Sequence, residues 1–180
     1  VRKTVTKEFI NRLTDNDTAA LISFDSSAIT LANFTSDKTV LCNAVDKLDS
    51  SGGTSLSVGI NSALNLFGNK EKAENRLQYI VMLTDGIGSY STTYTTKAKN
   101  ANIIINTIGL GNSVSQTVLT DMAEGTGGNY YHVNQADELY YIFDTIAEKA
   151  DYYKDSDGDG LSDYYEKEMA AARLVLGTGI

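Results

Sequence analysis

Five carboxylates within twelve residues are the strongest chemical signal in this chain. They fall in segment 155–166 (DSDGDGLSDYYE) at positions 1, 3, 5, 9 and 12, which are Asp155, Asp157, Asp159, Asp163 and Glu166. Gly160 stands at position 6, where such a loop turns sharply, and Leu161 at position 7 offers a backbone carbonyl. Because Ca²⁺ takes about six to eight oxygen ligands, this spacing predicts a calcium loop. The alternative is a solvated acidic linker, since charge runs are often disordered.

A second group of oxygen ligands is expected where buried strands end. The near-continuous apolar run 78–84 (QYIVMLT) is typical of a strand buried on both faces of a parallel sheet, and Asp85 follows it directly. Thr54 stands in a Gly-Gly-Thr loop that opens a helix. In an open α/β sheet, ligands bind beyond the carboxyl ends of the strands. A carboxylate and a hydroxyl brought together there would suit Mg²⁺.

Strand and helix patterns alternate from residue 1 to about 149 and predict a doubly wound, mostly parallel α/β sheet. The expected helices are 1–13, 37–48 (capped by Asp37), 55–67, 93–101, 114–124 and 136–150, and the expected strands are 18–24, 28–34, 78–84, 103–110 and 129–133.

A boundary is expected near residue 150. It separates a main domain, 1–149, from a segment, 150–180, that holds the calcium loop and a predicted helix, 164–174. Because so short a segment cannot bury much core, the metal is expected to organise it.

Residues 1 to about 149 resemble a von Willebrand factor type A domain. The resemblance rests on four pieces in the family's order: DTAALISF at 17–24, GGTSL at 52–56 with Gly-Ile at 59–60 and Ala-Leu at 63–64, MLTDG at 82–86, and IGLG at 108–111. It implies a Rossmann-like fold and a metal-ion-dependent adhesion site for Mg²⁺ or Mn²⁺. The ligands would be an Asp-x-Ser-x-Ser run on the first strand, Thr54 and Asp85, completed by a carboxylate of the partner.

The Asp-x-Ser-x-Ser run is absent from this sequence. The stretch Asp25-Ser26-Ser27 has the wrong spacing and follows the wrong strand to replace it. Without the first strand, its neighbours are expected to lose pairing partners and to leave a hydrophobic slot. The sequence is therefore interpreted as a fragment, or as a chain whose strand another segment supplies. The adhesion site is expected to bind metal weakly or not at all unless that strand is present.

The carboxyl-terminal segment resembles a thrombospondin type 3 repeat and, more loosely, EF-hand and dockerin loops. A dockerin normally needs two copies of the loop, and this sequence holds one. The resemblance implies a structural calcium site that follows the main domain within a larger multidomain chain.

Charge, cysteine content and hydropathy exclude several classes of protein. The formal net charge is −8 and no basic stripe is present, so nucleic acid is not an expected partner. Cys42 is the only cysteine, which rules out an intrachain disulfide, and it is expected to be a small buried hydrophobe. No apolar run approaches the roughly 20 residues of a membrane span.

No catalytic constellation is visible in the sequence, so no enzyme is expected. His132 is the only histidine and is expected to have a structural role, because no Gly-x-Ser-x-Gly nucleophile elbow is present. Gly109-Leu110-Gly111 follows a strand like the start of a dinucleotide motif, but Val114 stands where the third glycine is needed.

The favoured hypothesis is a metal-dependent adhesion or recognition module of a secreted or cell-surface bacterial protein. Its partner would be a protein that presents an acidic side chain. The alternative is an intracellular assembly or metal-insertion factor that uses the domain as an interaction platform. The calcium loop favours the first hypothesis, because cytosolic calcium is scarce and lone exposed sites are often weak, extracellular ones.

Overall fold

The computed structural model describes residues 2–15, 17–48, 53–68 and 77–152. The predicted calcium loop and the rest of 153–180 lie outside the described residues. The elements, in chain order, are α1 (Arg2–Arg12), β1 (Ala19–Phe24), β2 (Ala28–Thr35), α2 (Lys38–Asp46), α3 (Leu56–Gly68), β3 (Gln78–Thr84), α4 (Thr93–Asn100), β4 (Ile103–Leu110), α5 (Gln116–Glu124), β5 (Tyr130–Val133), a 3₁₀ turn (Ala136–Glu138) and α6 (Leu139–Tyr152).

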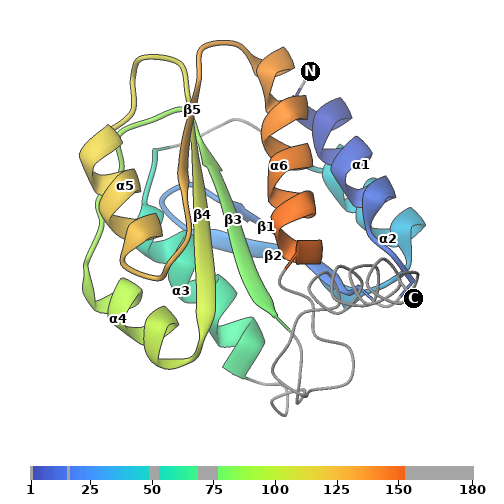
Figure 1. The fold of residues 1–180 in the computed structure, drawn as a ribbon, viewed down its shortest axis with the longest axis horizontal. Coiled ribbons are helices and arrows are strands. Elements are labelled where there is room, and N and C mark those ends of the chain that lie inside the picture. The colour runs from blue at the N-terminus through green and yellow to red at the C-terminus, as the bar shows by residue number, and fades with distance from the viewer. Residues whose placement is uncertain (1, 16, 49–52, 69–76, 153–180) are drawn as a thin grey trace, which may run out of the picture.

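The strands form two separate sheets within the described residues. β3, β4 and β5 make a parallel sheet in that order, with Gln78 opposite Ile103 and Thr107 opposite Tyr130. β1 and β2 form an antiparallel hairpin that stands beside it (Figure 1). The predicted α/β architecture with a mostly parallel sheet is confirmed.

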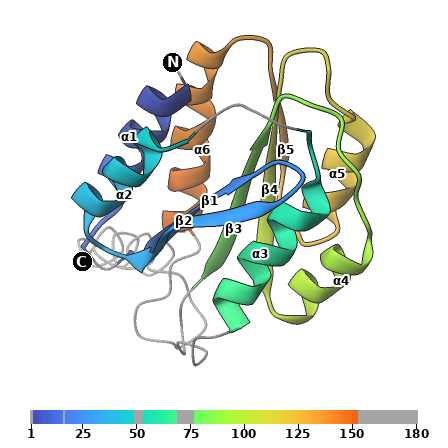
Figure 2. The ribbon, with the colours of Figure 1, turned by 180° about the vertical axis from the view of Figure 1, so that it is seen from behind.

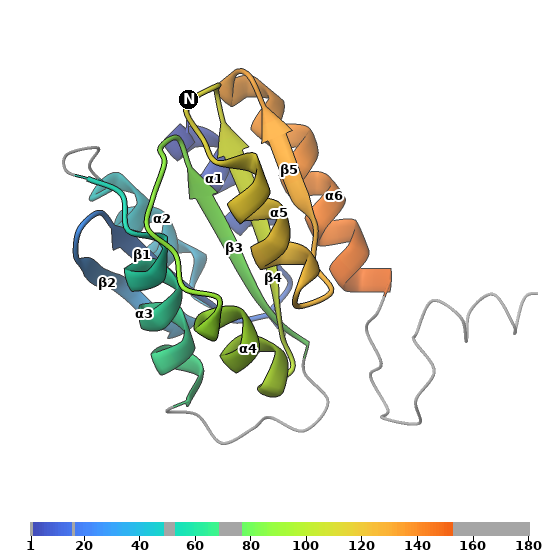
Figure 3. The same cartoon turned by 90° about the vertical axis from the view of Figure 1, so that its left-hand side faces the viewer.

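Helices cover both faces of the parallel sheet (Figures 1 and 3). Ile80 and Met82 of β3 pack into a cluster with residues of α3, α4 and α5. Val81 and Leu83, which alternate with them, pack against the cluster formed with α1 and α6. This two-sided covering places the carboxyl ends of the strands along one edge of the molecule.

Two burial predictions are wrong in part. β3 was expected to be buried on both faces, but Val81 and Leu83 are only half-buried while Ile80 and Met82 are buried. The reason is that β3 pairs with β4 alone among the described strands, so one of its sides has no neighbouring strand. Cys42 was expected to be buried and is half-buried, lying against the cluster of α2 and β2.

The amino end of α2 is fixed by a side-chain cap, as predicted. One carboxylate oxygen of Asp37 accepts hydrogen bonds from the backbone N–H groups of Thr39 (2.8 Å) and Val40 (3.2 Å). These two N–H groups have no partner inside the helix, so the cap replaces bonds that water would otherwise supply.

Asp37→Ala is therefore expected to lower the free energy of unfolding by about 1 kcal/mol. Asp37→Asn keeps a capping oxygen and is expected to restore most of that loss. Urea unfolding of the three proteins checks the prediction. Equal losses in both variants would contradict a capping role.

Candidate functional site at the carboxyl ends of the strands

The loop that opens α3 joins the ends of β1 and β3. The backbone N–H of Ser55 donates to the carbonyl of Asp25, directly after β1, at 2.8 Å. Ser55 also forms a parallel bridge with Ser89, a few residues beyond β3, and the N–H of Ser57 donates to the carbonyl of Ser89 at 3.2 Å. The carboxyl ends of two strands from separate sheets therefore meet at the start of one helix (Figure 2).

Thr54 lies against the turn that follows Asp85. A Cβ atom added at Gly86 would stand 2.6 Å from the hydroxyl oxygen of Thr54, so only glycine lets that hydroxyl approach. The turn itself is held by Thr84, which is buried and accepts a hydrogen bond from the N–H of Gly86 at 3.3 Å. The structure thus brings Thr54 next to the turn that follows Asp85. These are the two residues predicted to bind a metal at the carboxyl ends of the strands. We call this group, with Ser55 and Ser89, the strand-end site.

The hydroxyls of Ser55, Ser57 and Ser89 form a serine fringe in and beside the strand-end site. The sequence did not predict this fringe. The hydroxyl oxygens of Ser55 and Ser89 lie 3.4 Å apart, and the hydroxyl of Ser57 accepts from the N–H of Ser91 at 3.0 Å. Serines two residues apart occur at both 55/57 and 89/91, a signal that could have suggested the fringe. Ile87, which is 73% exposed, adds an apolar side chain at the same rim.

Asp25 reaches this edge through its backbone, while its carboxylate closes its own turn. One carboxylate oxygen accepts from the N–H of Ser27 at 2.6 Å and from the Ser27 hydroxyl at 3.0 Å. The Ser27 N–H, followed by the Ser27 hydroxyl, holds the pKa of the Asp25 carboxyl below its ordinary value. That oxygen of Asp25 therefore stabilises the turn through two hydrogen bonds from Ser27.

The donors present at the strand-end site fit a divalent ion only in part. No group of three or more His, Cys, Asp or Glu side chains suited to a metal occurs among the described residues. Thr54 and Asp85 offer one hydroxyl and one carboxylate, whereas Mg²⁺ needs about six oxygens in an octahedron and keeps several waters. These residues alone suit a weak ion site and not a closed one.

His132 makes a contact inside its own strand. Its Nδ1 lies 3.1 Å from the hydroxyl of Tyr130, and burial raises the pKa of that tyrosine. This pairing gives the histidine a polar partner on a half-buried strand. The roles of Thr54, Asp85 and the carboxyl-terminal loop as metal ligands stay predictions.

Across the described part of the chain, no helix has the length and apolar character needed to cross a bilayer.

The comparisons with known proteins point to the same family. The family model for the von Willebrand factor type A domain matches residues 1–145. Uncharacterized protein sll0103 of Synechocystis sp. is 26% identical over 141 residues, which make up 74% of this chain and 33% of that protein. The chain thus spans about a third of the length of the curated relative it matches.

Solved structures share the fold at low identity. A von Willebrand factor type A protein from Catenulispora acidiphila has a TM-score of 0.74 at 19% identity, covering 82% of this chain and 37% of that chain. Proximal thread matrix protein 1 from the mussel byssus, with a zinc-occupied adhesion-site motif, has a TM-score of 0.68 at 20% identity, with coverages of 82% and 39%. The corresponding domain of the pilus tip protein Mfa5 from Porphyromonas gingivalis scores 0.67 at 14% identity, with coverages of 82% and 86%.

Proposed function

The chain belongs to the von Willebrand factor type A family, and on that basis we propose that it binds a protein partner through the strand-end site. Domains of this family are protein-interaction modules of the adhesion type, generally not enzymes, and they commonly bind a metal at an adhesion site. The observation that carries the proposal is the approach of the Thr54 hydroxyl to the turn of Asp85, where the segments that follow β1 and β3 meet the start of α3.

The proposed metal at this edge is Mg²⁺ or Mn²⁺. A hydroxyl and a carboxylate are the hard oxygen donors that these ions prefer. Because the described donors are few, the ion would be held weakly and would retain open positions. A carboxylate of the partner would fill one of them. The exposed Ile87 and the serine fringe would contact the surface around that carboxylate.

The proposed setting is the outside of a bacterial cell, as part of a larger chain. Its support is the predicted calcium loop at 155–166, whose carboxylate spacing suits an ion abundant outside cells. The alternative, an intracellular assembly or metal-insertion factor, would use the same strand-end site without needing calcium. A dissociation constant for calcium far above the calcium concentration of the cytosol would favour the external setting.

The metal proposal is tested with Mn²⁺, whose unpaired electrons broaden nearby amide NMR signals even at low occupancy. Excess Ca²⁺ is kept present so that the predicted carboxyl-terminal loop is filled. We expect Mn²⁺ to broaden the signals of Thr54, Gly86 and Ile87 first. At the same concentrations the signal of Asn102, which lies just before the amino end of β4, should stay sharp.

Asp85→Asn is expected to abolish this selective broadening, because it removes the charged donor and keeps the size of the side chain. Asp121→Asn removes an exposed carboxylate from α5 and is the matched control, expected to change nothing. Selective broadening that survives in Asp85→Asn would show that Asp85 is not a ligand. Broadening that never becomes selective for the strand-end site would show that this site holds no metal.

A further inference from the structure

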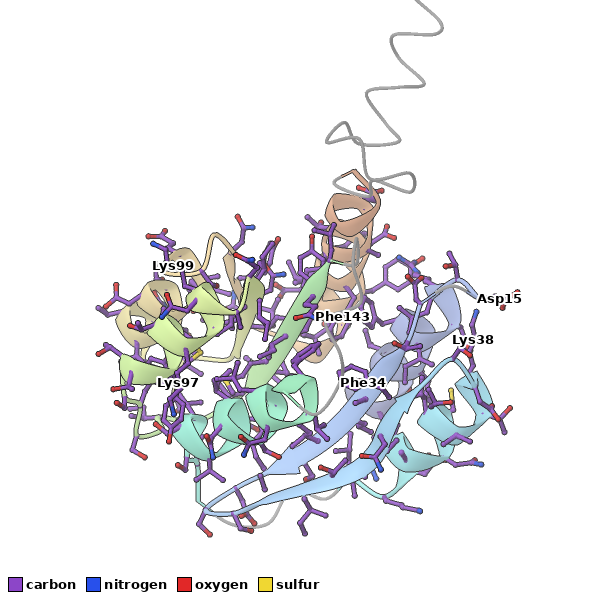
Figure 4. All side chains as sticks on the ribbon, turned by 90° about the horizontal axis from the view of Figure 1, so that it is seen from below. Asp15, Phe34, Lys38, Lys97, Lys99 and Phe143 are labelled. Atoms are coloured by element: carbon purple, nitrogen blue, oxygen red, sulfur yellow. The ribbon has the colours of Figure 1, made fainter. Side chains whose placement is uncertain are left out.

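β2 forms an outer edge of the fold that carries no charge. Among the described strands it pairs only with β1, and Figure 4 shows the hairpin of β1 and β2 at the margin of the molecule, beside α2 with its labelled Lys38. Edge strands usually carry lysine, other charges or proline, which prevent pairing with a second chain. The eight residues of β2, AITLANFT, include none of these. The register against β1 shifts on either side of Leu21, so the strand is bent and side chains must add to any backbone pairing at its free edge.

Ile29 adds an apolar side chain to this edge. It is 62% exposed. In the hairpin it stands opposite Ser23, which shares a face of β1 with Leu21, and Leu21 packs into the cluster of α2. Ile29 therefore lies on the face of the hairpin that α2 covers, so it can contact a molecule that approaches both β2 and α2.

α2 has one side against α1 and an opposite side that is exposed. The ammonium group of Lys38 donates to the carbonyl of Asn11 at 2.9 Å. Asp46 forms an ion pair with Lys7 at 2.7 Å. Two residues correspond to about 200° of helix rotation, so Val40, which is 47% exposed, lies nearly opposite Lys38. The exposed residues that share this outward side, at spacings of three and four, are Val40, Asn43 and Lys47.

Charges of opposite sign stand at the two ends of this outward side. Asp37 precedes α2 as its N-cap, and Lys47 follows its last residue. If two α2 helices lie antiparallel, Asp37 of each copy comes beside Lys47 of the other, whereas parallel helices would bring like charges together. Antiparallel helix dipoles attract as well. Because the chain has a net charge of −8, two copies repel over most of their surface, and this uncharged edge with its complementary charges is where they can meet.

We propose that this surface binds a second copy of the chain, with β2 and α2 antiparallel to their counterparts about a two-fold axis. We call the surface the outer flank, and it consists of the edge of β2 with Ile29, Asp37, Val40, Asn43 and Lys47. Paired strands lie about 4.8 Å apart and packed helices about 8–10 Å apart. Both contacts can form together, because α2 packs on the hairpin to which β2 belongs. The apolar part of the outer flank is small, so the dimer is expected to be weak and reversible.

The outer flank shares no residue with the strand-end site. The inference therefore does not rest on the proposed function. Antiparallel pairing turns the second copy end for end, so the two strand-end sites of a dimer would face opposite ways. A dimer could then link two partner molecules, and it would not place both sites on one partner.

Sedimentation equilibrium of the full chain up to about 1 mM, in constant excess Ca²⁺, tests the dimer. We expect a reversible equilibrium between monomer and dimer. Ile29→Lys and Val40→Lys should each raise the dimer dissociation constant by about tenfold or more, because each places a charge in the apolar part of the contact. Tyr141→Lys also replaces a side chain that is 71% exposed, on α6, and is the control that should leave the dissociation constant unchanged.

Two charge reversals test the antiparallel arrangement. Asp37→Lys and Lys47→Asp should each weaken self-association by about tenfold, because each variant brings like charges together at both ends of the contact. An equal mixture of the two variants should form a heterodimer about as tight as the parent dimer, since every lysine then faces an aspartate. Circular dichroism checks that Asp37→Lys, which loses the cap of α2, stays folded.

A chain that stays monomeric up to about 1 mM would overturn the proposal and leave the edge of β2 to a strand of a different protein. A dimer that neither Ile29→Lys nor Val40→Lys weakens would overturn it too, because the copies would then meet elsewhere. If both charge reversals weaken the dimer and their mixture does not restore it, the copies are not antiparallel along α2.

Discussion

Gly128→Ala is expected to lower the free energy of unfolding by about 3 kcal/mol or more, at the upper end of the cost of overpacking. A Cβ atom at position 128 would stand 2.0 Å from the carbonyl oxygen of Ile105 and 2.7 Å from its carbonyl carbon. Both are backbone atoms of the central strand β4, so no side-chain rotation relieves the clash. Ile105 is fully buried, and moving its backbone would disturb pairing with β3 as well.

Gly68→Ala is the matched control for this prediction. Gly68 is the last residue of α3, and an added Cβ would meet no atom within 4 Å. Because alanine is favoured over glycine in a helix, the change is expected to be neutral or to stabilise by up to about 1 kcal/mol. Urea unfolding measures both variants. A Gly128→Ala protein within about 0.5 kcal/mol of the parent, the range of ordinary surface changes, would show that the loop before β5 moves freely.

The central strands of the fold were predictable because their signals are strong. The bounds of β3 and β4 agree with the predicted runs 78–84 and 103–110, which are short and largely apolar. The cap at Asp37 was predictable from one residue type in one position. The start of the last described helix was harder to predict. The predicted helix 136–150 begins with a 3₁₀ turn before α6, and apolar spacing does not distinguish the two kinds of helix.

The strand-end site was only partly predictable. The general rule for α/β sheets placed Thr54 and Asp85 at one edge. That the Thr54 hydroxyl rests on Gly86, and that Ser55 and Ser89 approach each other, depends on two loops 34 residues apart in sequence. No local pattern encodes such an approach.

The divided sheet follows from an argument about pairing. The absence of the Asp-x-Ser-x-Ser run led to the expectation that neighbouring strands would lose their partners. Among the described strands, β1 and β3 lie in separate sheets, which agrees with that expectation without testing its cause. The sequence did not show how the hairpin stays in place without them. In the structure, Phe24 on Gly59 and the cluster of α2 hold it, so helices stabilise β1 where a strand does not.

Calorimetric titration of the full chain is expected to show one calcium event, which Asp159→Ala abolishes. Asp159 occupies position 5 of the predicted loop and supplies one of its few charged ligands. Loss of a direct ligand should weaken binding by about 100-fold or more, because even outer-shell partners of a metal contribute 10–100-fold. Glu168→Gln removes the same charge two residues beyond the loop, so it is expected to leave the event intact.

Asp85→Ala should leave that calcium event unchanged, and Mg²⁺ should give no calorimetric event, because the strand-end site offers too few donors to bind at calorimetric concentrations. A calcium event lost in Asp85→Ala and kept in Asp159→Ala would place the ion at the strand ends and make the carboxyl-terminal loop a solvated linker. A magnesium event lost in Asp85→Ala would show that Thr54 and Asp85 hold the ion without a further strand. The two substitutions thus separate a metal that organises the carboxyl-terminal segment from one that mediates partner binding.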